Sequence, residues 1–238
     1  MASAAYDALA PHYRRYALRR AAYCDGVDRL IAGWRPLQAS TMLDVGSGDG
    51  VRAVRLASSL GIDSLVLSDP SPPMIAQCRV NHNGPVLTCA AESLPSIAGT
   101  FDVITCVWNV LGAIEEPEPR LAALRGMKGR LAPSGRLFID VHNRYNVATA
   151  GLRRVITRMA RDLVTPGESN GLVSFTWEID GLRIPTRGYL FTEREMRALF
   201  AAAGLTPVRH AFVRYDSGEV CGRWRGQMVW ALEHATRE

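Results

Sequence analysis

Short apolar runs alternate with segments of helical spacing along most of the chain. Five such runs predict buried strands at 41–45, 64–68, 86–89, 101–107 and 136–141. Between these runs, apolar positions recur every three or four residues, which predicts helices at 51–60, 72–81 and 119–131. Strands and helices that alternate at this density predict a parallel sheet with helices on both faces.

The region after residue 190 adds a helix and two strands. Thr192 and Glu195 have the spacing of a capping box, and Gly204 is placed to end the helix that they open. The apolar segments 207–213 and 227–234 predict two closing strands that pair antiparallel. The predicted fold class is therefore α/β, a doubly wound and mostly parallel sheet of seven strands.

Two further segments fall outside the strand–helix alternation. Residues 1–35 have helical spacing and carry tyrosines at 6, 13, 16 and 23. Residues 142–190 form an insert too long for a plain connection; its first half is amphipathic and its second half predicts a hairpin with an Asp180-Gly181 turn. We expect a single domain, residues 1–238, made of a helical lid (1–35), a cofactor-binding core (36–141), a substrate cap (142–190) and closing elements (191–238).

The octapeptide Leu43–Gly50 reads Leu-Asp-Val-Gly-Ser-Gly-Asp-Gly and predicts a strand, a tight turn and a helix in succession. Alternate glycines let the backbone turn sharply and bring its N–H groups close to a ligand at the helix N-terminus. Asp44 would repel a pyrophosphate, and Val51 stands where the nicotinamide fingerprint needs its third glycine. S-adenosylmethionine, which carries positive charge and a carboxylate but no pyrophosphate, fits this loop.

Asp69 directly follows the second predicted strand, 64–68. Ligands of open parallel sheets bind beyond the carboxyl ends of the strands, so Asp69 is expected at the binding edge. A carboxylate there can accept both hydroxyls of a ribose, at about 1.5–3 kcal/mol for each charge-assisted hydrogen bond. The alternative is that Asp69 caps the helix predicted at 72–81.

Composition narrows the class of protein. A chain of 238 residues with 47% apolar side chains suits one globular domain, and without a membrane span or a signal pattern we expect a cytoplasmic protein with no membrane partner. The net charge of +5 comes from arginines interleaved with acids, and no nucleic-acid partner is expected. Five scattered cysteines and histidines without ligand spacing predict buried thiols and no metal site.

Several stretches, in this order, resemble the successive motifs of class I S-adenosylmethionine-dependent methyltransferases of the small-molecule type. They are Leu43–Gly50, Leu67–Met74, Ala91–Pro95, Phe101–Ile104 and Gly126–Phe138. The resemblance covers about residues 40–141, and the closing helix and strands extend it to about residue 235. It implies a Rossmann-like fold, S-adenosyl-L-methionine as cofactor, and methyl transfer to a nitrogen or oxygen of a small molecule in specialised metabolism.

The resemblance also implies individual roles. Asp44 would approach the ammonium group of the cofactor and Asp69 would hold its ribose, while Trp108 would face the sulfonium and contribute roughly 0.5–2 kcal/mol. Many members carry an acid before the Ala-Glu pair, but this chain has Ala90, which leaves open the residue that reads the adenine amino group. The implied cofactor-binding residues are Tyr13, Asp44, Gly46, Ser47, Gly48, Gly50, Asp69, Pro70, Ala91, Glu92, Val107 and Trp108.

Residues just past the fifth predicted strand are the candidates for the acceptor side of the reaction. His142 is a candidate general base with a pKa near the working pH, and Asn143 and Tyr145 are candidates for orienting an amine or hydroxyl. Arg144 and Asn109 are expected to contact the acceptor. Structural roles stay open for His142, as they do for Trp108.

Two other functions also stay open. The cofactor motifs do not specify which carbon leaves the sulfur, so a cyclase that converts the cofactor to azetidine-2-carboxylate and methylthioadenosine is one alternative. A non-catalytic S-adenosylmethionine-binding module is the other.

Overall fold

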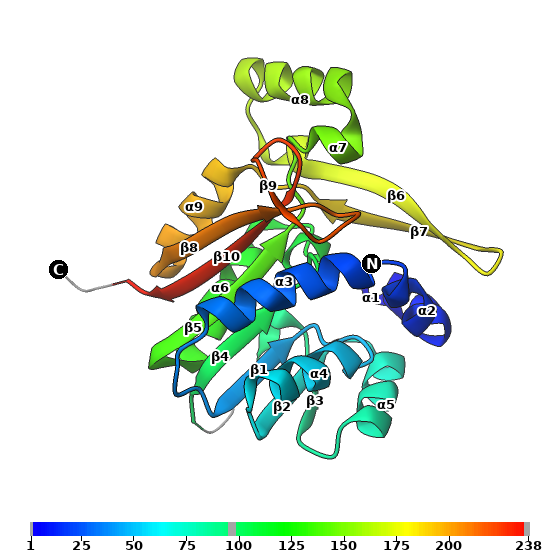
Figure 1. Ribbon diagram of the computed structural model, residues 1–238. Coiled ribbons are helices and arrows are strands. Elements are labelled where there is room, and N and C mark those ends of the chain that lie inside the picture. Colours follow the sequence, from blue (N-terminus) through cyan, green and yellow to red (C-terminus); the bar gives the residue numbers. More distant parts are fainter. Residues whose placement is uncertain (1, 95–98, 236–238) are drawn as a thin grey trace.

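The computed structural model describes residues 2–94 and 99–235, and its centre is one twisted sheet (Figure 1). Within those residues the sheet has eight strands in the order β3-β2-β1-β4-β5-β10-β8-β9. The strands from β1 to β5 run parallel, whereas β10 pairs antiparallel with both β5 and β8. Their bounds are β1 Thr41–Val45, β2 Ser64–Asp69, β3 Val86–Thr88, β4 Phe101–Cys106, β5 Leu131–Val141, β8 Leu205–Val213, β9 Val220–Cys221 and β10 Gln227–His234.

Helices cover both faces of the sheet, which confirms the doubly wound α/β fold. On one face Val27, Ile31 and Leu56 pack against the strands, and on the other face Met127 and Phe200 do so. The strands are apolar on both sides because both sides are covered. The covering helices are α3 Ala21–Trp34, α4 Val51–Leu60 and α5 Pro72–Asn81 on the first face, and α6 Pro117–Arg130 and α9 Glu193–Ala203 on the second.

Most element boundaries lie within two residues of the prediction, and two features of the sheet differ. β5 begins at Leu131 rather than at residue 136, because its pairing with β4 shifts register between Leu131 and Arg136 without ending the strand. β9 adds an eighth strand at the edge of the sheet, where it pairs with β8. Two residues are too few to show the alternation from which strands are predicted.

The N-terminal helices divide between the sheet and the ligand-binding edge. α3 packs on the sheet, whereas the helices before it lie beside the carboxyl ends of the strands and beneath the hairpin (Figure 1). Leu9 and Tyr13 are buried there against Trp177 and Ile184 of the hairpin. These helices are α1 Ala2–Leu9, the 3₁₀ turn η1 Ala10–His12 and α2 Tyr13–Leu18.

The insert forms a hairpin and a separate helical arm. The hairpin is as predicted: Asp180 and Gly181 both have positive φ, the conformation that a two-residue turn of type I′ requires. It extends over the N-terminal helices, while α8 lies at the end of the molecule farthest from β1 and β2 (Figure 1). Among the described residues, no helix has the length and apolar character needed to cross a membrane. The elements of the insert are α7 Val147–Ala150, α8 Leu152–Val164, η4 Glu168–Gly171, β6 Leu172–Ile179 and β7 Leu182–Tyr189.

Candidate cofactor and acceptor site

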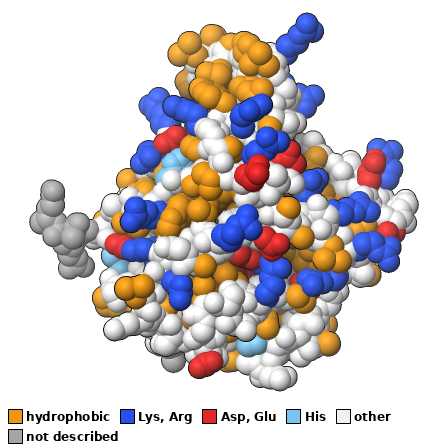
Figure 2. All heavy atoms as spheres, viewed as in Figure 1, with side chains coloured by type: hydrophobic (Ala, Val, Ile, Leu, Met, Phe, Trp, Pro, Cys, Tyr) orange, Lys and Arg blue, Asp and Glu red, His pale blue; other side chains and the backbone are white. Residues whose placement is uncertain are grey.

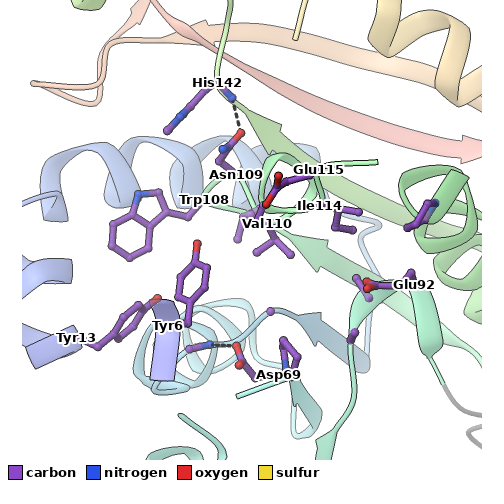
Figure 3. Close-up of a pocket in the computed structure, with 18 of the residues that line it drawn as sticks. Tyr6, Tyr13, Asp69, Glu92, Trp108, Asn109, Val110, Ile114, Glu115 and His142 are labelled. Carbon is purple, nitrogen blue, oxygen red and sulfur yellow. Dashed lines mark hydrogen bonds between the residues drawn. The ribbon is translucent and has the colours of Figure 1, made fainter. Parts of the chain in front are cut away.

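A cavity of about 470 Å³ lies at the carboxyl ends of β1, β2 and β4, between the sheet, the N-terminal helices and the hairpin (Figure 3). Its size is in the usual range for a small-molecule site. The residues that line it include most of the predicted cofactor set: Tyr13, Gly46, Gly48, Asp69, Pro70, Ala91, Glu92, Val107 and Trp108. Pro95, the last residue of the motif that begins at Ala91, lies outside the described residues.

The glycine turn is shaped by contacts that leave no room for side chains. Gly46 and Gly48 both have positive φ, and an added Cβ at Gly48 would lie 2.4 Å from the hydroxyl oxygen of Tyr13. An added Cβ at Gly46 would lie 2.5 Å from a methyl group of Val110. Gly50 does not fit its predicted role, because it precedes α4 and faces Leu67, outside both cavities described here.

Asp69 fastens the glycine turn to the end of β2. Its Oδ2 accepts the backbone N–H of Gly48 at 2.9 Å, and its Oδ1 accepts the backbone N–H of Ser71 at 2.9 Å. Burial raises the pKa of Asp69 to about 6, although both hydrogen bonds favour the charged form. Ser71, not Asp69, is the N-cap of α5. Each carboxylate oxygen keeps a free lone pair, so Asp69 can still accept two hydroxyl groups.

A smaller cavity of about 90 Å³ adjoins the first and shares Tyr13, Gly46, Val107 and Trp108 with it. Asp44 and Ser47, both predicted to hold the methionine part of the cofactor, line this second cavity. The Oδ1 of Asp44 accepts the hydroxyl of Thr105 at 2.5 Å, and burial raises the pKa of this carboxyl. The second cavity therefore carries an acid of the kind that attracts an ammonium group.

Arg52 also lines the second cavity, and sequence reasoning missed it. Its Nε and Nη2 donate to Oδ1 of Asp28 at 3.0 and 2.8 Å, whereas its buried Nη1 has no hydrogen-bond partner among the described residues. An unpaired guanidinium nitrogen beside a small cavity suits a carboxylate. The available signal was an arginine directly after the glycine turn, in the first turn of the following helix.

The end of β4 holds two consecutive non-glycine residues in the left-handed region. Trp108 has φ 65°, which is rare for a bulky side chain, and Asn109 has φ 61°, a conformation that asparagine adopts more readily. The Oδ1 of Asp140 accepts the backbone N–H of Asn109 at 2.9 Å, and the Oδ1 of Asn109 accepts the backbone N–H of His142 at 2.8 Å. Two strand ends are thus joined by side-chain-to-backbone hydrogen bonds at the wall of the large cavity.

Aromatic rings from four parts of the chain line the large cavity: the N-terminal helices, the end of β4, β6, and the loop between β8 and β9. Tyr16 stacks on Trp108 at 5.5 Å between ring centroids, and Tyr6 meets Trp177 edge to face at 5.0 Å. Trp108 donates its indole N–H to the hydroxyl of Tyr215 at 3.3 Å. Sequence reasoning singled out Trp108 and the lid tyrosines but missed the rings of β6 and Tyr215. The available signal was the pair of aromatic residues two positions apart in β6. The rings are Tyr6, Tyr13, Tyr16, Trp108, Phe175, Trp177 and Tyr215.

The charged groups that line the large cavity all have one sign. No lysine or arginine is among its described lining residues. Glu115 contributes a half-buried carboxylate to the lining (Figure 3), and its Oε2 lies 3.8 Å from Nη1 of the exposed Arg187. The lining carboxylates are Asp69, Glu92, Glu115 and Glu116.

His142 lines the cavity but does not have the predicted acid–base property. Burial lowers its pKa to about 4, and the positive charge of Arg20 adds to this shift. The prediction of a general base with a pKa near the working pH is therefore wrong. The ring is neutral at neutral pH, and its buried Nε2 has no hydrogen-bond partner among the described residues. His142 can hydrogen-bond an acceptor without taking a proton.

The three residues after His142 do not line the cavity, which contradicts their predicted roles. Asn143 donates to the carbonyl oxygens of Arg223 and Gly226 and so fastens the loop before β10. Arg144 is buried and forms ion pairs with Asp162 at 3.0 Å and Glu195 at 2.6 Å. Tyr145 donates its hydroxyl to Asp162 at 2.6 Å. These side chains anchor the insert to the core.

Comparison with known proteins agrees with this geometry. The family model described as "Methyltransferase domain" matches residues 12–210. The cypemycin N-terminal methyltransferase of a Streptomyces species is 30% identical over 140 residues, which are 58% of this chain and 57% of that protein. The chain therefore spans a little over half the length of this relative.

Two solved structures share the fold. The sugar N-methyltransferase KedS8 from Streptoalloteichus sp ATCC 53650 matches with a TM-score of 0.63 and 19% identity, over 92% of this chain and 90% of that one. S-adenosylmethionine-bound CalS10, an amino pentose methyltransferase from Micromonospora echinaspora, matches with a TM-score of 0.59 and 18% identity, over 91% of each chain. At these identities the likeness concerns the fold.

Proposed function

Because this chain belongs to the methyltransferase domain family, we propose that it transfers a methyl group from S-adenosylmethionine to an amine nitrogen of a small molecule. The observation that carries the choice of an amine is the lining of the large cavity, with four carboxylates, seven rings of tyrosine, tryptophan and phenylalanine, and no described lysine or arginine. Carboxylates and aromatic faces attract an ammonium group, whereas they repel a phosphate or a carboxylate. The names of the relatives, which include amino sugar and N-terminal methyltransferases, agree with this choice.

The two adjoining cavities fit the parts of S-adenosylmethionine. Asp69 would accept the ribose hydroxyls, and Ala91 and Glu92 would lie against the adenine at one end of the large cavity. In the small cavity, Asp44 would face the ammonium group and Nη1 of Arg52 the carboxylate. The sulfonium would then lie near Trp108, which borders both cavities.

Bound S-adenosylmethionine supplies an electrophilic methyl group. The acceptor nitrogen needs a free lone pair, so an acceptor bound as an ammonium group would lose one proton before transfer. Transfer would then break the C–S bond and form a C–N bond, with S-adenosylhomocysteine as the leaving group, and the positive charge would pass from sulfur to nitrogen. The chain itself mainly has to align the acceptor and exclude water; alignment is worth roughly 7–11 kcal/mol in favourable cases. The aromatic wall and the strained turn at Trp108 and Asn109 serve this purpose, and Glu115 is the carboxylate placed to attract the amine.

A small-molecule acceptor fits better than a nucleic acid. Proteins that bind nucleic acids contact phosphates mainly through lysine and arginine, and the described lining of this cavity holds neither. The proposed acceptor is therefore a free amine of limited size.

The test is a set of acceptors matched in shape, each offered as an amine, a hydroxyl and a carboxylate, with mass spectrometry of the products. We expect one added methyl group on the amines and S-adenosylhomocysteine as coproduct. Equal methylation of the hydroxyl series would move the assignment to O-methylation. Methylthioadenosine formed without any acceptor would identify a cyclase, and tight cofactor binding without turnover would identify a binding module.

A further inference from the structure

The amphipathic helix α8 is attached to the protein by polar contacts. Val155 is its only buried residue. Arg158 donates to the backbone carbonyl of Arg144 at 3.0 Å, and Asp162 accepts both the guanidinium of Arg144 and the hydroxyl of Tyr145. Amphipathic helices of globular proteins usually turn their apolar stripe toward the core. Here the contacts to the core are largely made by charged groups instead.

The apolar stripe of α8 faces solvent. Leu152, Ile156, Met159 and Leu163 recur at intervals of four, three and four residues and so form one ridge along the helix. Their exposed fractions are 61%, 56%, 39% and 84%, and Val164 is 76% exposed. Figure 2 shows apolar side chains gathered at the end of the molecule where Figure 1 places α8. A ridge this exposed marks an interaction surface.

Positive charge surrounds this ridge. Arg153, Arg154 and Arg161 are exposed on α8, and its one acid, Asp162, is engaged with Arg144. Tyr145 also packs near Trp224, which is 40% exposed and stands between two exposed arginines, Arg223 and Arg225. Figure 2 shows basic side chains around the apolar group. The complementary surface is therefore apolar in part and negatively charged.

We propose that α8 binds an anionic lipid surface, with its apolar ridge in the headgroup region and its arginines on lipid phosphates. A helix of 13 residues extends about 20 Å, too short to cross the hydrocarbon core, so it would lie along the surface. A second copy of the chain would bring two arginine-rich helices together, whereas anionic headgroups complement them. No membrane partner was expected from the sequence because its apolar stretches are too short to span a bilayer. That length does not bear on a helix that lies along the membrane surface.

The experiment is sedimentation of the full chain with vesicles. We expect binding to phosphatidylcholine vesicles that contain phosphatidylglycerol, weak binding to pure phosphatidylcholine, and release as salt is raised. The double variant I156E/L163E should bind at least about tenfold more weakly because the ridge can no longer enter the headgroups. The variant R153Q/R154Q should lose about fivefold for each arginine removed.

Matched controls come from α5, where Val80 is 84% exposed and Arg79 is exposed beside it. V80E and R79Q should bind anionic vesicles like the unmodified chain, and all variants should keep their affinity for S-adenosylmethionine, which shows that they are folded. The proposal is overturned if anionic vesicles do not bind, or if the α8 and α5 variants bind alike. A dimer in light scattering that I156E/L163E dissociates, without vesicle binding, would assign the ridge to a second copy instead.

Discussion

The carboxylate of Asp140 accepts the backbone N–H of Asn109, which lies with Trp108 in a turn of two consecutive left-handed residues. Asp140 is fully buried, and its Oδ1 accepts the backbone N–H of Asn109 at 2.9 Å. Its Oδ2 accepts the hydroxyl of Tyr23 at 2.7 Å, which orients the carboxylate. Burial raises the pKa of Asp140, and the hydrogen bonds and the charge of Arg52 oppose that rise. One buried acid on β5 therefore fixes the turn at the end of β4, where the two cavities meet.

Replacement of Asp140 by Ala should impair transfer more than cofactor binding. Alanine offers no acceptor to the backbone N–H of Asn109, so the turn that this hydrogen bond holds would relax. We expect turnover to fall by about tenfold to a hundredfold, with little change in the dissociation constant of S-adenosylmethionine. Tyr23→Phe is the matched control, since it removes only the second hydrogen bond and should cost about 1 kcal/mol of stability. Equal turnover in D140A and the unmodified chain would contradict the role of the turn.

Cofactor affinity should fall as the pH is lowered through about 6, the raised pKa of Asp69. Below that pH the protonated carboxyl can no longer accept two hydroxyl groups while it accepts the N–H groups of Gly48 and Ser71. Stability should respond in the opposite direction. A pKa above the unfolded value means that the folded state binds more protons, so Asp69 favours folding below about pH 4 and loses this contribution as the pH rises through 6.

Calorimetric titration of S-adenosylmethionine between about pH 5 and 8 measures this dependence. Asp69→Ala should weaken binding about tenfold to several hundredfold at high pH and flatten the pH profile. A profile that keeps its shape in the folded variant would show that another group titrates.

Gly48→Val should abolish cofactor binding and leave the fold largely intact. The new side chain would meet the Tyr13 hydroxyl and reduce the cavity that Gly48 lines, in a conformation with φ +57°. Gly61→Ala is a matched control, because Gly61 also has positive φ but nothing lies within 4 Å of the added Cβ. It should cost about 1–2 kcal/mol of stability and leave affinity unchanged. Near-normal cofactor binding by G48V would show that the glycine turn has only a structural role.

Arg52→Leu should discriminate between ligands with and without the amino acid part. Loss of a charge-assisted hydrogen bond from the unpaired Nη1 should weaken S-adenosylmethionine about tenfold to a hundredfold. Methylthioadenosine lacks the carboxylate and should bind the variant and the unmodified chain equally well. A parallel loss for both ligands would mean that Arg52 acts only through its ion pair with Asp28.

Tyr145→Phe should affect stability and not catalysis. It removes the hydrogen bond to Asp162 that fastens α8, at about 0.5–1.5 kcal/mol, while the cavity stays unchanged. Thermal unfolding and steady-state kinetics on the same preparation measure both effects. A large fall in turnover at unchanged stability would indicate that Tyr145 contacts the acceptor after all.

The sequence by itself determined the elements that local rules specify. Alternation of apolar runs with helical spacing predicted the doubly wound sheet, and the Asp180-Gly181 turn and the Thr192–Glu195 capping box were read from short patterns whose physics is local. The glycine turn and Asp69 were found because a ligand at the carboxyl edge requires those residue types next to those strands.

Only the tertiary structure decided the acceptor side and the surface. Position after β5 pointed to Asn143, Arg144 and Tyr145. The loop before β10 takes up the side chain of Asn143, and Asp162 of α8 takes up those of Arg144 and Tyr145. Arg52 and Glu115 became candidates because the tertiary structure places them at the walls of the two cavities. The orientation of the apolar ridge of α8 depends on the contacts that its arginines make. The spacing of residues along the chain determines which side chains share one face of a helix or strand. Long-range packing determines whether that face contacts the core, a ligand or solvent.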